Sequence, residues 1–437
     1  MRGLKSTLAL LVILVGVVAY IYFVDSDKPV NDTPAKDKAF SGVTADDIEE
    51  LQIKAGGESS RLQKTDGKWQ LVEPLKADAD NTEASNIASS LATIDIQRVV
   101  DENASNLKDY GLDPARIDIG FRAKGKKDVQ HILIGEKTPT GGDLYAQVAG
   151  SKRIFLVQSF LDSTFDKNTF ALRDKKVLTF DRDKADSLEL VSADKTLQFA
   201  KQGSDWSIVK PMAARADFGA VEGALERVAS VQMQGITAEN GGDPKMYGLD
   251  KPSATITIGQ GSSKATLTLG KTDNAVVYAK DAARPMIFTV APTLNTDLFK
   301  DVADYRRKDL FDSRSFTMDK VTFTRGSENV TLEHSKAKDG KDVWKNAAGK
   351  EVDGAKVEDL LNKLGTLRAD KFQAQADPAL KSPVLTVNAR FANDKMETVA
   401  FARSGTSAVA SRSDEAGSAT LDMMAFDEVM KGIDAMK

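Results

Sequence analysis

The stretch LQKTDGKWQLVEP, residues 62–74, decides the fold because close variants of it return twice further along the chain. These variants are LQFAKQGSDWSIVKP (residues 197–211) and LEHSKAKDGKDVWKN (residues 332–346). Their tryptophans, Trp69, Trp206 and Trp344, are separated by 137 and 138 residues. Self-similarity at a fixed period indicates one structural unit that is used several times. The sequence therefore predicts tandem modules.

A second phrase repeats in the same register. The residues YGLD at 110–113 return at 247–250, again 137 residues later, whereas the third copy has ALKSP at 379–383. We therefore expect the third module to be divergent. Glycine suits a turn that needs positive φ, so this phrase is predicted to be structural, with a recognition loop as the alternative. The repeat signature consists of Trp69, Trp206, Trp344, Tyr110, Gly111, Tyr247 and Gly248.

The order of elements within a module follows from periodicity. A short antiparallel meander ends at the tryptophan, and a helix follows with Asp80 as its cap and an apolar stripe at helical spacing. After the YGLD phrase come four short alternating strands and a closing helical segment. The predicted fold class is α+β, with an N-terminal transmembrane helix and three repeat modules built on antiparallel sheets. The predicted ranges are 1–24 for a cytoplasmic tip and anchor, 25–42 for a linker, and 43–176, 177–309 and 310–437 for the modules.

The amino terminus predicts the compartment. Residues 6–24 contain no charge, and 19 residues of helix span about 28 Å, close to the hydrocarbon thickness of a bilayer. Arg2 and Lys5 precede this run while Asp25 and Asp27 follow it, which by the positive-inside rule places the rest of the chain outside the cytoplasm. We therefore expect a single-pass anchor in a bacterial inner membrane, with the C-terminal part in the periplasm. A cleaved signal peptide is the alternative.

Composition excludes several classes of protein. The 437 residues are 41% hydrophobic and 28% charged, which is typical of globular modules. The net charge of −4 and the sequence pI near 5.6 argue against a nucleic-acid binder, which normally carries a basic stripe. Two short basic runs, 173–176 and 306–308, recur at corresponding module ends, and we expect them to be solvated junctions. There is no cysteine, hence no disulfide.

Catalytic motifs are scarce, so no catalytic, cofactor or metal site is predicted. The two histidines, His131 and His334, have no spacing typical of a zinc site. LGKT at residues 269–272 resembles the end of a phosphate-binding loop, but Ala265 stands where the first glycine of that motif belongs. The three tryptophans could be ligand platforms, yet a tryptophan in a hairpin before a helix is more often a core anchor. The sequence thus predicts a protein that is not an enzyme.

The phrases above also carry a resemblance. W-x-x-x-x-P before a capped helix (Trp69 with Pro74, Trp206 with Pro211), the YGLD phrase and a strand ending in L-x-[IL]-G-[EK] resemble the bacterial family catalogued as domain of unknown function 4340. The resemblance covers almost everything after the anchor. It implies an association with an ATP-binding-cassette transporter whose other ectodomain component resembles gliding-motility proteins.

These observations lead to one expected function and one alternative. We expect a membrane-anchored periplasmic accessory or scaffold protein of such a transporter or envelope assembly, acting by protein–protein interaction, because successive similar modules build an extended body. The alternative is a periplasmic protein that binds a glycan or lipid between modules or on their sheets. An exposed flat apolar patch favours the former, and a concave pocket favours the latter.

Overall fold

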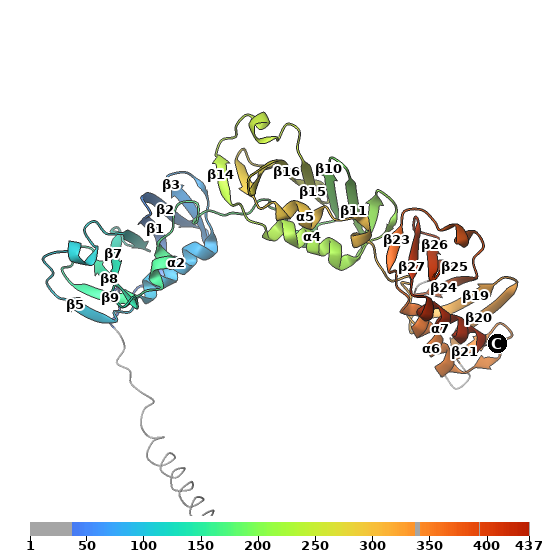
Figure 1. Cartoon of the computed structure of the whole chain (residues 1–437). Coiled ribbons are helices and arrows are strands. Elements are labelled where there is room, and N and C mark those ends of the chain that lie inside the picture. Colours follow the sequence, from blue (N-terminus) through green and yellow to red (C-terminus); the bar gives the residue numbers. More distant parts are fainter. Residues whose placement is uncertain (1–36, 337–340, 393, 437) are drawn as a thin grey trace, which may run out of the picture. The chain divides into compact units, whose positions relative to one another are not determined.

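The structure is a computed structural model that describes residues 37–336, 341–392 and 394–436. It contains two compact units, Met1–Asp174 and Lys175–Lys437 (Figure 1). The first unit holds one nine-stranded antiparallel sheet and the second holds two such sheets. The strand order is equivalent in all three, so the predicted repeat is confirmed at the level of the fold.

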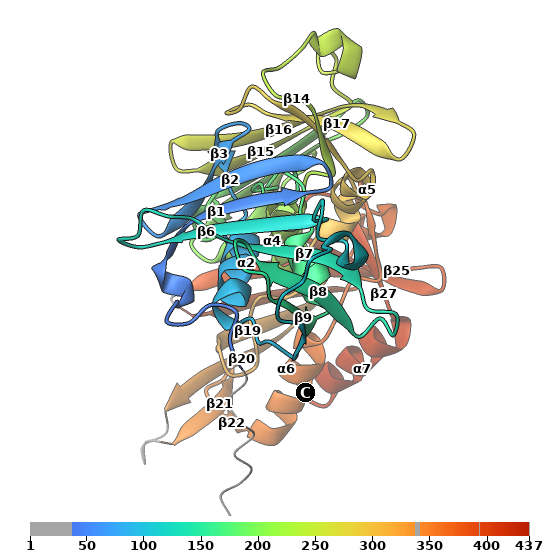
Figure 2. The ribbon, with the colours of Figure 1, turned by 90° about the vertical axis from the view of Figure 1, so that its left-hand side faces the viewer.

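In the first sheet the order is β4-β3-β2-β1-β6-β7-β8-β9-β5. Its strands are β1 (Ile48–Ala55), β2 (Glu58–Thr65), β3 (Lys68–Glu73), β4 (Ala77–Asp78), β5 (Arg98–Asp101), β6 (Ile117–Ala123), β7 (Gln130–Lys137), β8 (Asp143–Val148) and β9 (Ile154–Gln158). Strand β1 pairs with both β2 and β6, which joins the tryptophan meander and the later strands into one continuous sheet. Figure 2 shows β2, β1 and β6 side by side, with α2 (Asn81–Thr93) below them in this view.

The second and third sheets repeat this topology within the second unit. The second sheet contains β10 (Ser187–Ser192), β11 (Thr196–Gln202), β12 (Asp205–Lys210), β13 (Ala214–Arg215), β14 (Gly235–Ala238), β15 (Ala254–Gln260), β16 (Ser263–Asp273), β17 (Val276–Asp281) and β18 (Ile287–Val290). The third contains β19 (Met318–Arg325), β20 (Glu328–Lys336), β21 (Asp342–Asn346), β22 (Glu351–Val352), β23 (Lys371–Gln373), β24 (Leu385–Phe391), β25 (Lys395–Ser404), β26 (Ser407–Arg412) and β27 (Ser418–Leu421).

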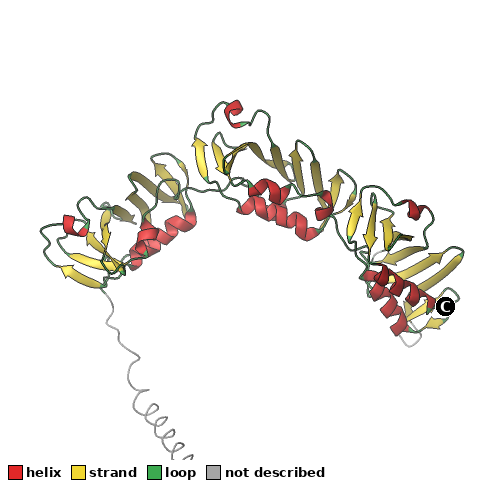
Figure 3. Ribbon diagram, viewed as in Figure 1, coloured by secondary structure: helices red, strands yellow, loops and turns green. Residues whose placement is uncertain are grey.

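The helices lie on one face of each sheet (Figure 3). They are α2 and α3 (Leu161–Phe165) on the first sheet, α4 (Phe218–Ser230) and α5 (Thr293–Leu298) on the second, and α6 (Gly354–Gly365) and α7 (Met423–Asp434) on the third. Each helix that follows a tryptophan hairpin begins after an aspartate whose carboxylate accepts hydrogen bonds from free backbone N–H groups of the first turn. These caps are Asp80, Asp217 and Asp353. The predicted position of the helix is therefore confirmed.

The core lies between each sheet and its helices. In β6 the alternating residues Ile117, Ile119 and Phe121 are fully buried, as expected of a strand with one face against the core. The apolar stripe of α4 is Val221, Ala224, Leu225 and Val228, and all four residues are buried.

The structure corrects the predicted fold class. The described residues are mostly antiparallel sheet, in three nine-stranded sheets with few helices, and no helix among them is long and apolar enough to cross a membrane. The predicted anchor, 1–24, lies outside the described residues. The structure thus gives no support to a single-pass anchor or an inner-membrane location, and that prediction is withdrawn. The exact ranges predicted for the linker and the modules remain predictions.

Isolated β-bridges tie the connecting segments to the ends of the main helices α2, α4 and α6. The segment before each first strand pairs with the chain just after the main helix, through Lys38↔Asp95, Lys176↔Gln232 and Asp309↔Arg368. The segment after each closing helix returns to the start of the main helix, through Ala79↔Arg173 and Ala216↔Arg306. The chain therefore leaves the second sheet beside β13, where the candidate site is built.

The YGLD phrase crosses the sheet face opposite the helices and contacts it through a glycine. A Cβ at Gly270 would lie 2.1 Å from the backbone oxygen of Tyr247. Strand registers place Gly270 at the same position as Ala402 of the third sheet, where the phrase is missing. At this position a side chain is therefore present in the sheet that lacks the YGLD phrase and absent from the sheet that the phrase contacts.

Replacing Gly270 with alanine should destabilise the second unit by about 1–3 kcal/mol, because the added methyl group overpacks this contact. Thermal melting and proteolysis within 244–250 would measure the effect. Gly223→Ala is the matched control, since that glycine lies inside α4 where an added Cβ would have no atom within 4 Å, and alanine favours helix. Equal melting temperatures for the two variants would refute the proposed contact.

Candidate functional site at the junction of the second and third sheets

The candidate site lies where the edge strand β13 of the second sheet meets the loop between β26 and β27 of the third. The backbone N–H of Ala416 donates to the oxygen of Ala213 at 3.0 Å. Arg215 occupies β13, and Arg306 is held beside it because the N–H of Arg307 donates to the oxygen of Arg215. Two arginines are thereby fixed at one edge of the second sheet.

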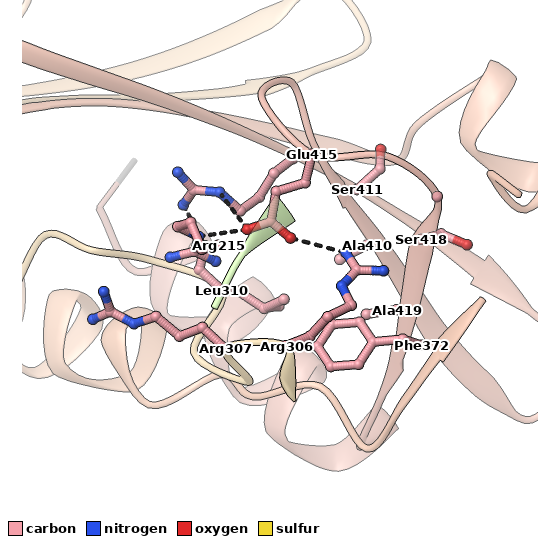
Figure 4. A pocket seen from close by; sticks show the side chains of 12 residues that line it. Arg215, Arg306, Arg307, Leu310, Phe372, Ala410, Ser411, Glu415, Ser418 and Ala419 are labelled. Atoms are coloured by element: carbon pink, nitrogen blue, oxygen red, sulfur yellow. Dashed lines mark hydrogen bonds and ion pairs between the residues drawn. The ribbon is translucent and has the colours of Figure 1, made fainter. Parts of the chain in front are cut away.

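Glu415 of the third sheet joins these two arginines (Figure 4). Its Oε1 accepts a hydrogen bond from Nε of Arg215, and its Oε2 accepts one from Nη2 of Arg306 at 2.9 Å. The side chains of Arg306 and Glu415 are only 4% and 5% exposed. The guanidinium carbon of Arg306 also lies 4.0 Å from the ring centroid of Phe372 in β23, which adds a cation–π contact.

Asp312 forms the second centre of the junction. Its Oδ1 lies 2.7 Å from Nη1 of Arg215 and 2.8 Å from Nη1 of Arg307, and its Oδ2 lies 3.5 Å from Nη2 of Arg412. Burial alone would raise the pKa of Asp312, but the charges of these arginines hold it below its ordinary value. Asp312 is therefore ionised at neutral pH.

Arg412 and Glu397 form a buried pair within the third sheet. Nη1 of Arg412 donates to Oε2 of Glu397 at 2.9 Å and to the backbone oxygen of Leu310 at 2.7 Å. Glu397 also accepts the backbone N–H of Ser313 at 3.0 Å and the hydroxyl of that serine. Burial alone would lower the pKa of Arg412, but its hydrogen bonds to Asp414 and Glu397 raise it. We call Arg215, Arg306, Arg307, Asp312, Glu397, Arg412, Asp414 and Glu415 the junction cluster.

The equivalent loop of the second sheet carries the opposite charges. Strand β17 pairs with β18 in the same register as β26 pairs with β27. Asp281 therefore corresponds to Arg412, and Arg284 corresponds to Glu415. Arg284 bonds Asp281 at 2.8 Å and donates to the backbone oxygens of Lys176 and Val177. The same two positions therefore hold an ion pair in both sheets, but the acidic and the basic residue have exchanged places.

A cleft of about 760 Å³ lies beside the junction cluster. We call it the junction cleft. Its lining comes from the β11–β12 turn and β12, the start of α4, the segment 307–312, Arg368, Phe391, Lys395 and Asp414. A cavity of this volume is within the range of small-molecule sites.

The structure places the predicted tryptophans in separate sheets. Trp69, Trp206 and Trp344 lie in β3, β12 and β21, and all are buried. The indole N–H of Trp206 donates to Oε1 of Glu222 at 2.8 Å, with Nζ of Lys201 over the ring. The residue also forms part of the lining of the junction cleft, so one of the three reaches the candidate site.

The predicted tyrosine phrases contribute no residue to the junction cluster. Tyr110 packs against Tyr145, and Tyr247 packs against Tyr278, each pair with ring centroids 5.1 Å apart. Gly111 and Gly248 follow at φ values of 66° and 68°, in the left-handed conformation that ends the short helices η3 (Lys108–Tyr110) and η5 (Pro244–Tyr247).

Sequence reasoning missed the junction cluster and misread part of it. The run 306–308 was expected to be a solvated junction, but Arg306 is buried and paired, so the prediction was wrong for that residue. The signal was the recurrence of an arginine at both module ends, Arg173 and Arg306, which are equally buried. A recurring charge at a fixed place in a repeat indicates a structural partner that sequence alone does not name.

The chemistry of the site is that of charge pairing. Nowhere in the described residues do three or more His, Cys, Asp or Glu side chains form a group that could hold a metal ion. His131 lies in the first unit, with Nδ1 2.7 Å from Asp118, and His334 packs against Trp344, so neither histidine joins the junction cluster. The described groups at the junction fix two sheets to each other.

The lowered pKa of Asp312 predicts an acid dependence of stability. A carboxylate whose pKa is lower in the folded chain stabilises it above the unfolded value of about 4, and this contribution is lost as pH falls through the folded value. Urea midpoints measured between about pH 2 and pH 7 should fall less steeply for Asp312→Asn than for the parent. The exposed Asp194→Asn variant is the control and should follow the parent curve. Parallel curves for all three proteins would contradict the assignment.

Comparison with known proteins gives little beyond a family. No curated protein matches the chain. Among solved structures, a DnaN sliding clamp (DNA polymerase III subunit beta) from Pseudomonas aeruginosa bound to griselimycin is 8% identical, with 88% of this chain and 93% of that chain covered and a TM-score of 0.17. A putative 6-phosphogluconolactonase from Bacteroides uniformis is 10% identical, with 85% and 83% covered and a TM-score of 0.08. Scores this low carry no argument about fold or function.

The family model is informative because it matches the repeated region. The model described as "Domain of unknown function (DUF4340)" matches residues 69–207 and 206–383. The first match begins at the first tryptophan of the repeat, and both matches include Trp206. Because the two matches together span well over half of the chain, the protein belongs to the family described as Domain of unknown function (DUF4340).

Proposed function

We propose that this protein is a non-enzymatic scaffold that acts by protein–protein interaction. The observation that carries the proposal is the junction cluster, which fixes the second sheet to the third through carboxylates that each pair with more than one arginine. Breaking one partner of a buried pair is costly, so the two sheets behave as one body. A body with fixed internal spacing can hold partner proteins at defined positions.

The ionisable groups of the junction cluster support a structural role. A general base works best with a pKa near the operating pH and with a free lone pair directed at substrate. The charges of arginines keep the pKa of Asp312 below its ordinary value, and hydrogen bonds from Arg412 do the same for Asp414. Both oxygens of Glu397 and of Glu415 already accept hydrogen bonds. The role of these carboxylates is therefore to hold the second and third sheets together.

Exposed apolar side chains on the second unit offer contact points for a partner. Phe316 is 87% exposed, Met424 is 75% exposed and Met396 is 65% exposed. Contiguous exposed apolar patches mark interaction surfaces, whereas single exposed apolar side chains are ordinary, so these three positions are the ones to probe for a partner. The family resemblance makes a component of an ATP-binding-cassette transporter the first partner to test.

Site-specific photo-crosslinking in the native cell tests this proposal. A photoreactive residue at Phe316 should give a discrete crosslinked species whose protein partner is identified by mass spectrometry. The same residue at Lys264, an exposed position of β16, is the control and should give no such species. Identical products from both positions, or none from a set covering Phe316, Met396 and Met424, would refute the scaffold function.

A second candidate function has its own observation. The junction cleft is concave and large enough for a small ligand, which favours a ligand-binding protein such as the glycan or lipid binder considered from the sequence. The two functions are separable because the exposed side chains named above do not line the junction cleft.

A further inference from the structure

We propose that the junction cleft binds a small organic anion that joins a phosphate or carboxylate group to an aromatic or apolar part. This inference rests on the second candidate function, and it names the class of ligand. The charges that remain free in the junction cleft, one exposed aromatic ring and the rigidity of the walls support this inference.

The acids of the junction cleft are largely engaged by other groups. Asp309, Asp312 and Asp414 pair with arginines, and Asp217 accepts the N–H of Ala220 as the cap of α4. Asp205 is the exception among the five lining acids, since within the described chain its side chain makes neither an ion pair nor a hydrogen bond.

Two lysines of the lining are free to meet an anion. Lys308 and Lys395 are exposed, and within the described ranges neither side chain makes an ion pair or hydrogen bond. Arg368 joins them, with a side chain 62% exposed and only its Nε near Asp309, at 3.2 Å. Lys308 lies between the sheets and Lys395 begins β25, so an anion in the junction cleft would meet cations from two sides. Charge-assisted hydrogen bonds of this kind are the strong ones.

An aromatic ring lies in the same cleft. Phe218 is the first residue of α4 and is 55% exposed, which is unusual for phenylalanine in a globular protein. Nζ of Lys201 lies 5.7 Å from its ring centroid. The remaining open ring surface suits an apolar or aromatic part of a ligand.

The walls of the junction cleft are held by the junction cluster itself. Arg215, Arg307, Asp312 and Asp414 belong to both. Binding therefore does not need to order the cations' backbone or to close one sheet on the other. Preorganisation of this kind raises affinity by lowering the entropy cost of binding.

Isothermal titration of the full chain with phenyl phosphate tests the inference. We expect saturable binding at one site, weakened about tenfold or more by Lys308→Gln with Lys395→Gln, because charged hydrogen bonds are lost. Phe218→Ala should also weaken phenyl phosphate, but should leave inorganic phosphate unaffected. The matched control is Lys264→Gln with Lys381→Gln, which removes the same charge from exposed positions outside the junction cleft and should bind like the parent.

Three outcomes would overturn the inference. The first is absence of phenyl phosphate binding at millimolar concentration, and the second is equal binding by the two double variants. The third is equal or tighter binding of phenyl glucoside, a neutral ligand, in a manner sensitive to Phe218→Ala. In that third case the anion class is wrong while the ligand-binding function stands. Circular dichroism of each variant shows whether it is folded.

Discussion

Replacing Glu415 with alanine is expected to lower the free energy of unfolding of the second unit by roughly 3–5 kcal/mol. The change removes the shared acceptor of Arg215 and Arg306 and leaves the buried charge of Arg306 without its carboxylate. Desolvation makes such an orphaned charge expensive, far more than an exposed ion pair. Glu415→Gln keeps the shape and one acceptor, so its cost should be smaller.

Urea denaturation combined with hydrogen exchange measures this effect on the full chain. Because the chain has two compact units, exchange at 213–216 and 410–417 reports the junction directly, independently of the first unit. Glu333→Ala is the control, since that glutamate pairs with Lys320 and Arg390 at half-exposed positions and its loss should cost at most about 1 kcal/mol. Protection at the junction that is the same in both variants would show that the junction cluster does not hold the sheets together.

Trp206→Ala is the second substitution with a large expected effect, also about 3–5 kcal/mol. The indole is buried in β12, and its N–H donates to Glu222 of α4, so truncation opens a cavity and removes one of the two donors to this carboxylate oxygen, the other being Nζ of Lys201. The melting temperature should drop, and protease cleavage should increase within 177–309.

The conservative Trp206→Phe variant separates packing from ligand contact. It retains most of the buried volume and loses only the hydrogen bond, so its stability should lie between parent and alanine variant. Ligand binding lost in Trp206→Phe at parental stability would mean that this residue acts in the junction cleft and not as a core anchor.

The sequence was sufficient for the local architecture. Tryptophan phrases and aspartate caps recur with their neighbours because short-range patterns, alternation in strands and spacing in helices, are written within about 20 residues. The pairing of β1 with β6 was not predictable in this way, since Leu51 and Phe121 meet only after the intervening helix has folded back. That pairing turns two groups of strands into one nine-stranded sheet, so the described fold is mostly antiparallel sheet and the predicted α+β class was wrong.

The junction cluster was beyond sequence reasoning for a related reason. Arg215 and Glu415 are 200 positions apart, and Arg306 and Glu415 are 109 positions apart. With 64 acidic and 60 basic residues, a single chain offers no means to select these pairs. Burial selects these pairs, because the charges lose their hydration only in the folded chain, where an unpaired buried charge would be costly.

The inverted ion pairs of the two homologous loops bear on how such an array could arise. If the second module were simply duplicated, Arg284 of the new copy would face Arg215 and Arg306, and three like charges would meet without water. A tandem gene duplication would thus yield a repelling joint until both members of the pair had changed sign. The order of the two modules consequently depends on the signs of these charges. Replacing Asp281 and Arg284 with the residue types found at 412 and 415 would give the second module the charges of the third.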